Sequence, residues 1–162
     1  MKKNSQPYQY QEGHEKEILA KLERFCAYQE RCEKDVLNKL VSWKVPESIF
    51  PSIFESLKKN KFIDQQRFVH IFTEGKFKLK GWGKQKIKQH LLSKNIDTSI
   101  IEDTLTEIED ESYTQKLDKL LRQKRQSLKG ETNYMLRGKL FNYAIRKGYE
   151  PELIYTWLDE NI

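Results

Sequence analysis

The chain is poor in the residues that turns require. It has only seven glycines and four prolines among 162 residues, whereas β-rich folds need many turn residues. It also lacks any run of about 18 apolar residues, which excludes a membrane-spanning helix. Two lysines near the N-terminus are not followed by an apolar stretch. We therefore expect no signal peptide, and a cytoplasmic protein.

Cysteine and histidine are equally scarce. Cys26 and Cys32 have five residues between them, which matches no zinc pattern, and no nearby histidine completes one. We expect reduced structural thiols, with a redox pair as the alternative. His70 and His90 have no obvious nucleophile or carboxylate partner. We therefore predict no catalytic set, no metal and no cofactor.

What the sequence does contain is helical periodicity. Apolar residues recur at intervals of three and four, as in Ile18, Leu22 and Cys26, and nine such segments follow one another without a strand signal. Asp64 and Asp97 suit the N-cap positions of two of these helices. The pattern predicts an all-α fold.

Three segments beginning at Asp35, Lys86 and Lys139 align with one another, so that Val45, Ile96 and Tyr149 coincide and Lys44, Asn95 and Gly148 share the position expected after a helix end. Their spacing predicts three tandem three-helix repeats, stacked into an elongated, curved molecule. We expect a flexible tail over 1–14 and repeats over 15–64, 65–112 and 113–162.

Acidic residues are absent from one long stretch of this basic chain. The net charge is +6, and from Gly75 to Ile96 there are seven lysines and no acid. Lys84, Lys86 and Lys88 crowd the start of a helix, where N–H groups and lysines would together favour phosphate or carboxylate. We predict an anion there, with a solvated lysine face as the alternative.

Three neighbouring features carry open alternatives. The Gly81-Trp82-Gly83 turn lacks the spacing of a P-loop, and its tryptophan either covers the core or stacks on a base. A second basic stretch is either a contact face or plain surface; it contains Lys116, Lys119, Arg122, Lys124, Arg125 and Lys129. The acidic block from Glu102 to Glu111 is either a solvated face or a contact for a basic partner.

Residues 61–96 contain four motifs in order: Phe62-Ile63-Asp64, Arg67-Phe68-Val69, the Gly81-Trp82-Gly83 turn before a helix, and the pair Ile87 and Leu91. These motifs resemble those of the RecX family of bacterial recombination regulators. Residues 139–157, with Lys147-Gly148-Tyr149, resemble the last repeat of the family, and the resemblance extends over residues 17–160. Cys32 stands where the family often has a serine N-cap, and Asn60 and Asn95 replace glycines at helix ends.

The resemblance implies three tandem three-helix repeats and binding to the RecA filament, in its helical groove. It implies inhibition of the RecA ATPase, of strand exchange and of the stimulated cleavage of the SOS repressor, and binding of single- or double-stranded DNA by some members. We expect a monomeric regulator without enzymatic activity. The alternatives are a sequence-nonspecific nucleic-acid-binding helical-repeat protein and a helical scaffold for another protein.

Charge density selects the residues that we expect to contact the partner. The sequence leaves open whether these residues contact RecA or DNA phosphates. It also leaves open whether inhibition comes from restricting the motions of RecA protomers or from favouring the loss of subunits from filament ends. The predicted RecA- or DNA-binding residues are Arg67, Lys76, Lys78, Lys80, Lys84, Lys86, Lys88, Arg146 and Lys147.

Overall fold

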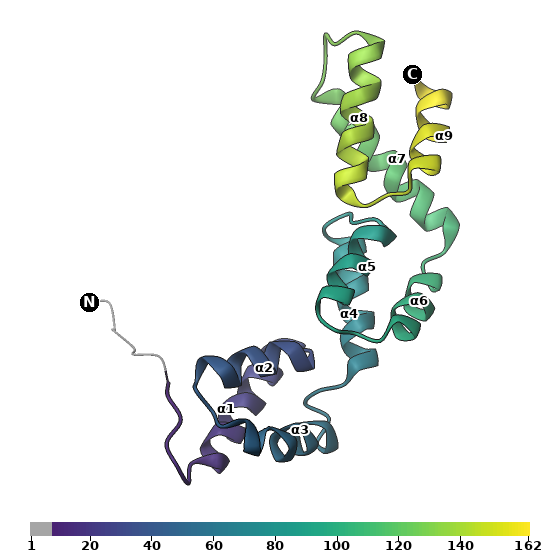
Figure 1. Ribbon diagram of the computed structural model, residues 1–162. Helices are drawn as coiled ribbons and strands as arrows, with labels where there is room; N and C mark the ends of the chain where they lie inside the picture. Colours follow the sequence, from purple (N-terminus) through teal and green to yellow (C-terminus); the bar gives the residue numbers. More distant parts are fainter. Residues whose placement is uncertain (1–7) are drawn as a thin grey trace, which may run out of the picture. The chain divides into compact units, whose positions relative to one another are not determined.

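Helices make up most of the chain that the computed structural model describes, residues 8–162. This part contains nine α-helices, one 3₁₀ turn and no strand, which confirms the all-α prediction (Figure 1). The elements are α1 (Glu15–Tyr28), α2 (Glu33–Ser42), η1 (Glu47–Ile49), α3 (Phe50–Lys59), α4 (Gln65–Lys78), α5 (Lys84–Ser93), α6 (Thr98–Thr106), α7 (Asp110–Gln126), α8 (Asn133–Lys147) and α9 (Pro151–Asn161).

The second helix of each repeat ends in the same backbone motif. Lys44, Asn95 and Gly148 have φ of 55°, 60° and 93°, so all three occupy the left-handed position that was predicted for them. In each case the next residue donates its N–H to the carbonyl five residues back: Val45 to Leu40 at 3.0 Å, Ile96 to Leu91 at 3.3 Å and Tyr149 to Ala144 at 3.2 Å. The repeat is therefore visible in hydrogen bonding as well as in sequence.

The end of α3 uses a different residue from the predicted one. Asn60 keeps a φ of −88°, and Lys61 has the positive φ, 58°. The Phe62 N–H then reaches the Leu57 carbonyl at 2.8 Å, as in the other three motifs. Because α3 extends to Lys59, Asn60 precedes the left-handed position by one residue.

Side chains at the helix starts supply acceptors for free N–H groups. Asp64 Oδ1 accepts from the Arg67 N–H at 2.9 Å, and Asp97 Oδ1 accepts from the Ser99 N–H at 2.8 Å, as predicted. Cys32, which stands where the family often has a serine N-cap, forms a capping box with Asp35 at the start of α2. Its thiol takes the role of the serine hydroxyl, so the substitution does not leave the helix uncapped.

Two compact units divide the chain, one ending at Phe68 and one running from Val69 to Ile162. In the first unit the buried side chains of α1, α2 and α3 form one core. Tyr8 and Tyr10 pack on it: the Tyr8 ring lies 5.2 Å from Trp43, and the Tyr10 N–H donates to the Trp43 carbonyl at 2.8 Å. Part of the predicted tail is thus held on the first repeat, and residues 1–7 of it lie outside the described residues.

The second unit contains most of α4 and all of α5 to α9. An aromatic group joins its two repeats: Tyr113 of α7 lies 6.0 Å from Phe77 of α4 and 5.0 Å from Tyr149, measured between ring centroids. All three rings are buried. The repeat boundaries chosen from the sequence stay predictions, but these contacts bring the second and third repeats together.

Both cysteines are buried and reduced in the first unit. Burial raises the pKa of the Cys26 thiol to about 11, so this thiol is protonated and unreactive at neutral pH. Over residues 8–162 no helix has the length and apolarity that a membrane crossing needs.

Candidate polyanion-binding surface

The start of α5, where an anion was predicted, faces the end of α8. The Gly83 N–H donates to the Lys147 carbonyl at 2.8 Å, and the Gln85 N–H donates to the Gly148 carbonyl at 3.1 Å. A helix C-terminus carries partial negative charge and a helix N-terminus partial positive charge, so this contact is favourable. An anion on these N–H groups would have to displace the third repeat. The predicted anion site at the helix N-terminus is therefore wrong.

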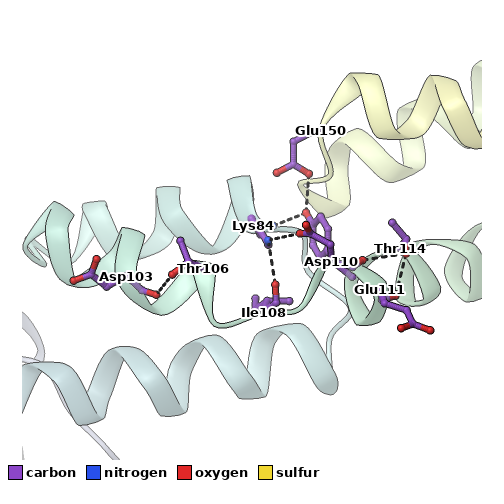
Figure 2. A network of polar contacts seen from close by, with 9 residues as sticks. Lys84, Asp103, Thr106, Ile108, Asp110, Glu111, Thr114 and Glu150 are labelled. Atoms are coloured by element: carbon purple, nitrogen blue, oxygen red, sulfur yellow. Dashed lines mark hydrogen bonds and ion pairs between the residues drawn. The ribbon is translucent and has the colours of Figure 1, made fainter.

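Lys84 completes the same junction from its other side. Its N–H donates to the Tyr113 hydroxyl at 2.8 Å, and that hydroxyl donates to Glu150 Oε2 at 2.8 Å. Its ammonium lies 3.4 Å from the Ile108 carbonyl and 3.7 Å from Asp110 Oδ1, and Figure 2 shows these groups converging on it. Only 22% of the side chain is exposed. Lys84 is thus a structural link between repeats.

Three other lysines also donate to backbone carbonyls around this junction. The pairs are Lys86 Nζ with the Arg146 carbonyl at 3.1 Å, Lys147 Nζ with the Lys80 carbonyl at 2.9 Å and Lys116 Nζ with the Lys78 carbonyl at 2.7 Å. These carbonyls lie at or just beyond the C-terminal ends of α8 and α4, where partial negative charge accumulates. Lysine at the start of α5 is stabilised in this way by the ends of other helices.

The result is a group of ammonium charges that we call the lysine cluster: Lys80, Lys86, Lys116 and Lys147. Burial, followed by the charges of Lys86, Lys116 and Lys80, lowers the pKa of Lys147. The three charges that act on Lys147 are therefore all positive, like its own. Mutual repulsion of this kind is relieved when an anion binds among the lysines. The cluster is suited to a phosphate or another polyanion.

Trp82 lies next to the cluster and is half-buried. The ammonium groups of Lys76 and Lys86 lie 4.8 and 4.7 Å from its ring centroid, and the rings of Phe72 and His90 lie 6.4 and 4.5 Å away. Since four side chains already contact the indole, a base could stack on it only by displacing some of them. The structure favours the packing role for Trp82 over base stacking.

The remaining predicted contact residues do not join the lysine cluster. Lys78 pairs with Glu74 and Lys88 pairs with Glu102. Arg67 belongs to the first unit, where its Nε lies 2.7 Å from Glu30 Oε1 and its Nη2 donates to the Lys61 carbonyl at 2.9 Å. Charge density alone therefore selected several cations that already have carboxylate partners.

Lys116 is the member of the cluster that the predicted contact residues did not include. It was placed instead in the second basic stretch, because 38 residues separate it from Lys78. Stacking of the third repeat on the second brings them together. The only available signal was the repeat itself, since α7 and α4 occupy matching places in successive repeats.

Comparison with known proteins agrees with this architecture. Residues 64–105 match the family description of the second three-helix domain of RecX, and residues 110–158 match that of the third. Together these matches cover more than half of the chain, in the order of the repeats.

Three curated relatives carry the same family name, regulatory protein RecX. The one from Clostridium beijerinckii is 36% identical over 125 residues, covering 76% of this chain and 58% of its own. The one from Finegoldia magna is 31% identical over 133 residues (80% and 64%), and the one from Oceanobacillus iheyensis 29% over 130 residues (80% and 48%). The chain thus spans between 48% and 64% of the length of these relatives.

Solved structures show the same fold. The crystal structure of RecX from Lactobacillus salivarius superposes with a TM-score of 0.78 and 22% sequence identity, covering 90% of this chain and 94% of that one. Another crystal structure of regulatory protein RecX gives a TM-score of 0.80, covering 90% of this chain and 71% of that one. With both domain matches in register and relatives along most of its length, this chain belongs to the RecX family.

Proposed function

We propose that this chain binds the RecA nucleoprotein filament and inhibits its ATPase, strand-exchange and coprotease activities. It would thereby modulate homologous recombination and the SOS response in the cytoplasm, as a monomer that binds and does not catalyse. Membership of the RecX family supports the proposal. The lysine cluster is the observation on this chain that supports it, because its ammonium groups have no carboxylate partner among residues 8–162 and can attract a filament built on DNA.

The proposed contact surface differs in part from the set chosen by charge density. Lys80, Lys86 and Lys147 stay in it, Lys116 joins it, and the nearby Lys76 and Arg146 flank it. Lys84 acts indirectly, by holding α5 against α7. The three remaining cations are paired with carboxylates and contribute through longer-range attraction; they are Arg67, Lys78 and Lys88.

The decisive test is the single-strand-dependent ATPase of RecA from the same organism, with this protein titrated in. Inhibition is expected, and Lys80→Glu with Lys116→Glu is expected to weaken it at least tenfold, since each reversal turns attraction into repulsion. The matched control is Lys16→Glu with Lys59→Glu, which makes the same change in net charge at exposed positions of the first unit. No inhibition by the unmodified protein would overturn the proposal.

A second function has support from the same surface, namely nucleic-acid binding without RecA specificity. Four clustered lysines attract phosphates whatever protein coats the strand. Binding to bare single-stranded DNA together with an unchanged RecA ATPase would favour this second function.

A further inference from the structure

A pocket of about 240 Å³ lies in the second unit, between α4, the end of α6 and the start of α7. It is smaller than the pockets of about 300–1,000 Å³ that take drug-sized ligands. A single long side chain is a better match to this size. The pocket is lined by His70, Thr73, Glu74, Phe77, Lys78, Thr104, Glu107, Ile108, Glu109 and Ser112.

The floor of this pocket is apolar apart from two hydroxyl groups. Phe77 and Ile108 contribute apolar surface, while Thr73 and Thr104 are buried polar residues with 3% and 8% exposure. Thr104 donates its hydroxyl to the Ile100 carbonyl at 2.9 Å. The Thr73 hydroxyl has no hydrogen-bond partner within residues 8–162. A buried polar group left unsatisfied is destabilising, so this hydroxyl favours a ligand that brings it a donor.

The rim of the pocket is acidic. Glu74 pairs with Lys78, and Glu107 Oε2 lies 3.2 Å from His70 Nδ1. Glu109 lines the same rim and forms no ion pair with any residue that the structure describes. The rim therefore carries three carboxylates against one lysine and one histidine, and it attracts a cation although the chain as a whole is basic.

We propose that this acidic pocket receives one arginine side chain of a partner protein. The methylene stem would lie along Phe77 and Ile108, as long cationic side chains do on apolar surface. The guanidinium would donate to the Glu109 carboxylate, and it would reach the Thr73 hydroxyl after a rotation of that side chain. Arginine suits the pocket better than lysine, because its planar group stacks on aromatic rings, is weakly hydrated and carries five donors.

The arginine pocket is distinct from the lysine cluster and has the opposite charge. A partner that engaged both would need an anionic surface and a protruding arginine, which a protein bound to DNA can offer together. The inference rests on the proposed function only for the identity of the protein that supplies the arginine. The pocket itself is tested without RecA, so the two proposals can fail separately.

The test is an NMR titration of the full chain with N-acetylarginine N-methylamide. The neutral isostere, N-acetylcitrulline N-methylamide, and the lysine analogue serve as parallel probes. Saturable shifts of the Thr73, Phe77 and Glu109 signals are expected with the arginine probe, with at least tenfold weaker binding of the citrulline probe, as expected for loss of a charge-assisted hydrogen bond. Glu109→Gln should weaken arginine binding by about the same factor, and Thr73→Val should weaken it less.

Glu160→Gln is the matched control, since it removes one exposed carboxylate from α9, away from the pocket lining. Each variant is first compared with the unmodified chain by circular dichroism, which shows whether it keeps its fold. Equal binding of the arginine and citrulline probes would overturn the proposal. So would the absence of shifts at Thr73 and Phe77, and equal binding of the lysine probe would overturn the assignment to arginine.

Discussion

At the scale of single residues, the contact between Gly83 and Gly148 joins the second and third repeats. A Cβ atom on Gly83 would lie 2.2 Å from the Gly148 carbonyl oxygen, and one on Gly148 would lie 2.3 Å from Lys86 Cβ. Gly148 also needs its left-handed φ of 93°. Two glycines are thus required, one for space alone and the other for both space and conformation.

Gly83→Ala should lower the free energy of unfolding by about 1–3 kcal/mol, the usual cost of overpacking. The added methyl group meets backbone atoms, so the repeats must separate locally. Urea unfolding followed by circular dichroism measures the loss. Gly75→Ala in α4 is the control: a Cβ there meets nothing within 4 Å, and alanine should stabilise the helix by about 0.5–1 kcal/mol. An equal effect of both substitutions would contradict the steric explanation.

Lys44 holds the left-handed position where its counterpart Gly148 has no side chain. Because a Cβ atom is strained there, Lys44→Gly should raise the free energy of unfolding, by up to about 1 kcal/mol after the entropic cost of glycine is subtracted. Lys59→Gly at the end of α3 is a useful comparison, since it gains no conformational relief and should destabilise the chain. The two melting temperatures should therefore move in opposite directions.

At the scale of elements, Tyr113 of α7 links the start of α5 to the start of α9. Tyr113→Phe keeps the ring but removes the hydroxyl that accepts from Lys84 and donates to Glu150. The part-buried Lys84 N–H then lacks an acceptor, so we expect a loss of about 1–3 kcal/mol in unfolding free energy. Tyr134→Phe is the control, since that ring is 89% exposed. A loss of equal size in both variants would argue against the hydroxyl bridge.

The lysine cluster makes stability depend on pH in a definite direction. The folded-state pKa of Lys147 lies below its ordinary value of 10.5. The protonated form is therefore disfavoured by folding, and the contribution of this group to stability is present above pH 10.5 and lost as the pH falls through the lower folded pKa. Lys80→Gln removes one repelling charge and should raise the pKa of Lys147, measured by NMR titration of the lysine side chains. Lys59→Gln should leave it unchanged, and a pKa that did not rise with Lys80→Gln would contradict the cluster.

Local features were predictable from the sequence and distant ones were not. The helices, the caps at Asp64 and Asp97 and the left-handed positions depend on residues within about one turn, whose spacing is written in the chain. The lysine cluster depends on contacts between residues 60 and 67 positions apart. The resemblance to RecX correctly indicated the repeats. It did not show that the N–H groups at the start of α5 were already satisfied by α8.

At the scale of the whole molecule, the net charge of +6 leads us to expect binding to single-stranded DNA that weakens with salt. If the four lysines of the cluster neutralise four phosphates, the slope of log K against log salt should be about −3. Fluorescence anisotropy with a labelled oligonucleotide measures it. Lys80→Gln with Lys116→Gln should halve the slope, whereas Lys16→Gln with Lys59→Gln should leave it nearly unchanged. A slope that is equal in the two double variants would assign the binding to general charge.

The junction of α5 with α8 also has a consequence for the order of events during synthesis of the chain. The start of α5 needs acceptors from the end of α8, and Lys86 and Arg146 lie 60 residues apart. At about 5–20 residues per second, a ribosome would take roughly 3–12 seconds to add those residues. During that interval the second repeat would be on the nascent chain with a lysine-rich helix end still open to solvent. The second repeat can therefore finish folding only after the third repeat has been translated.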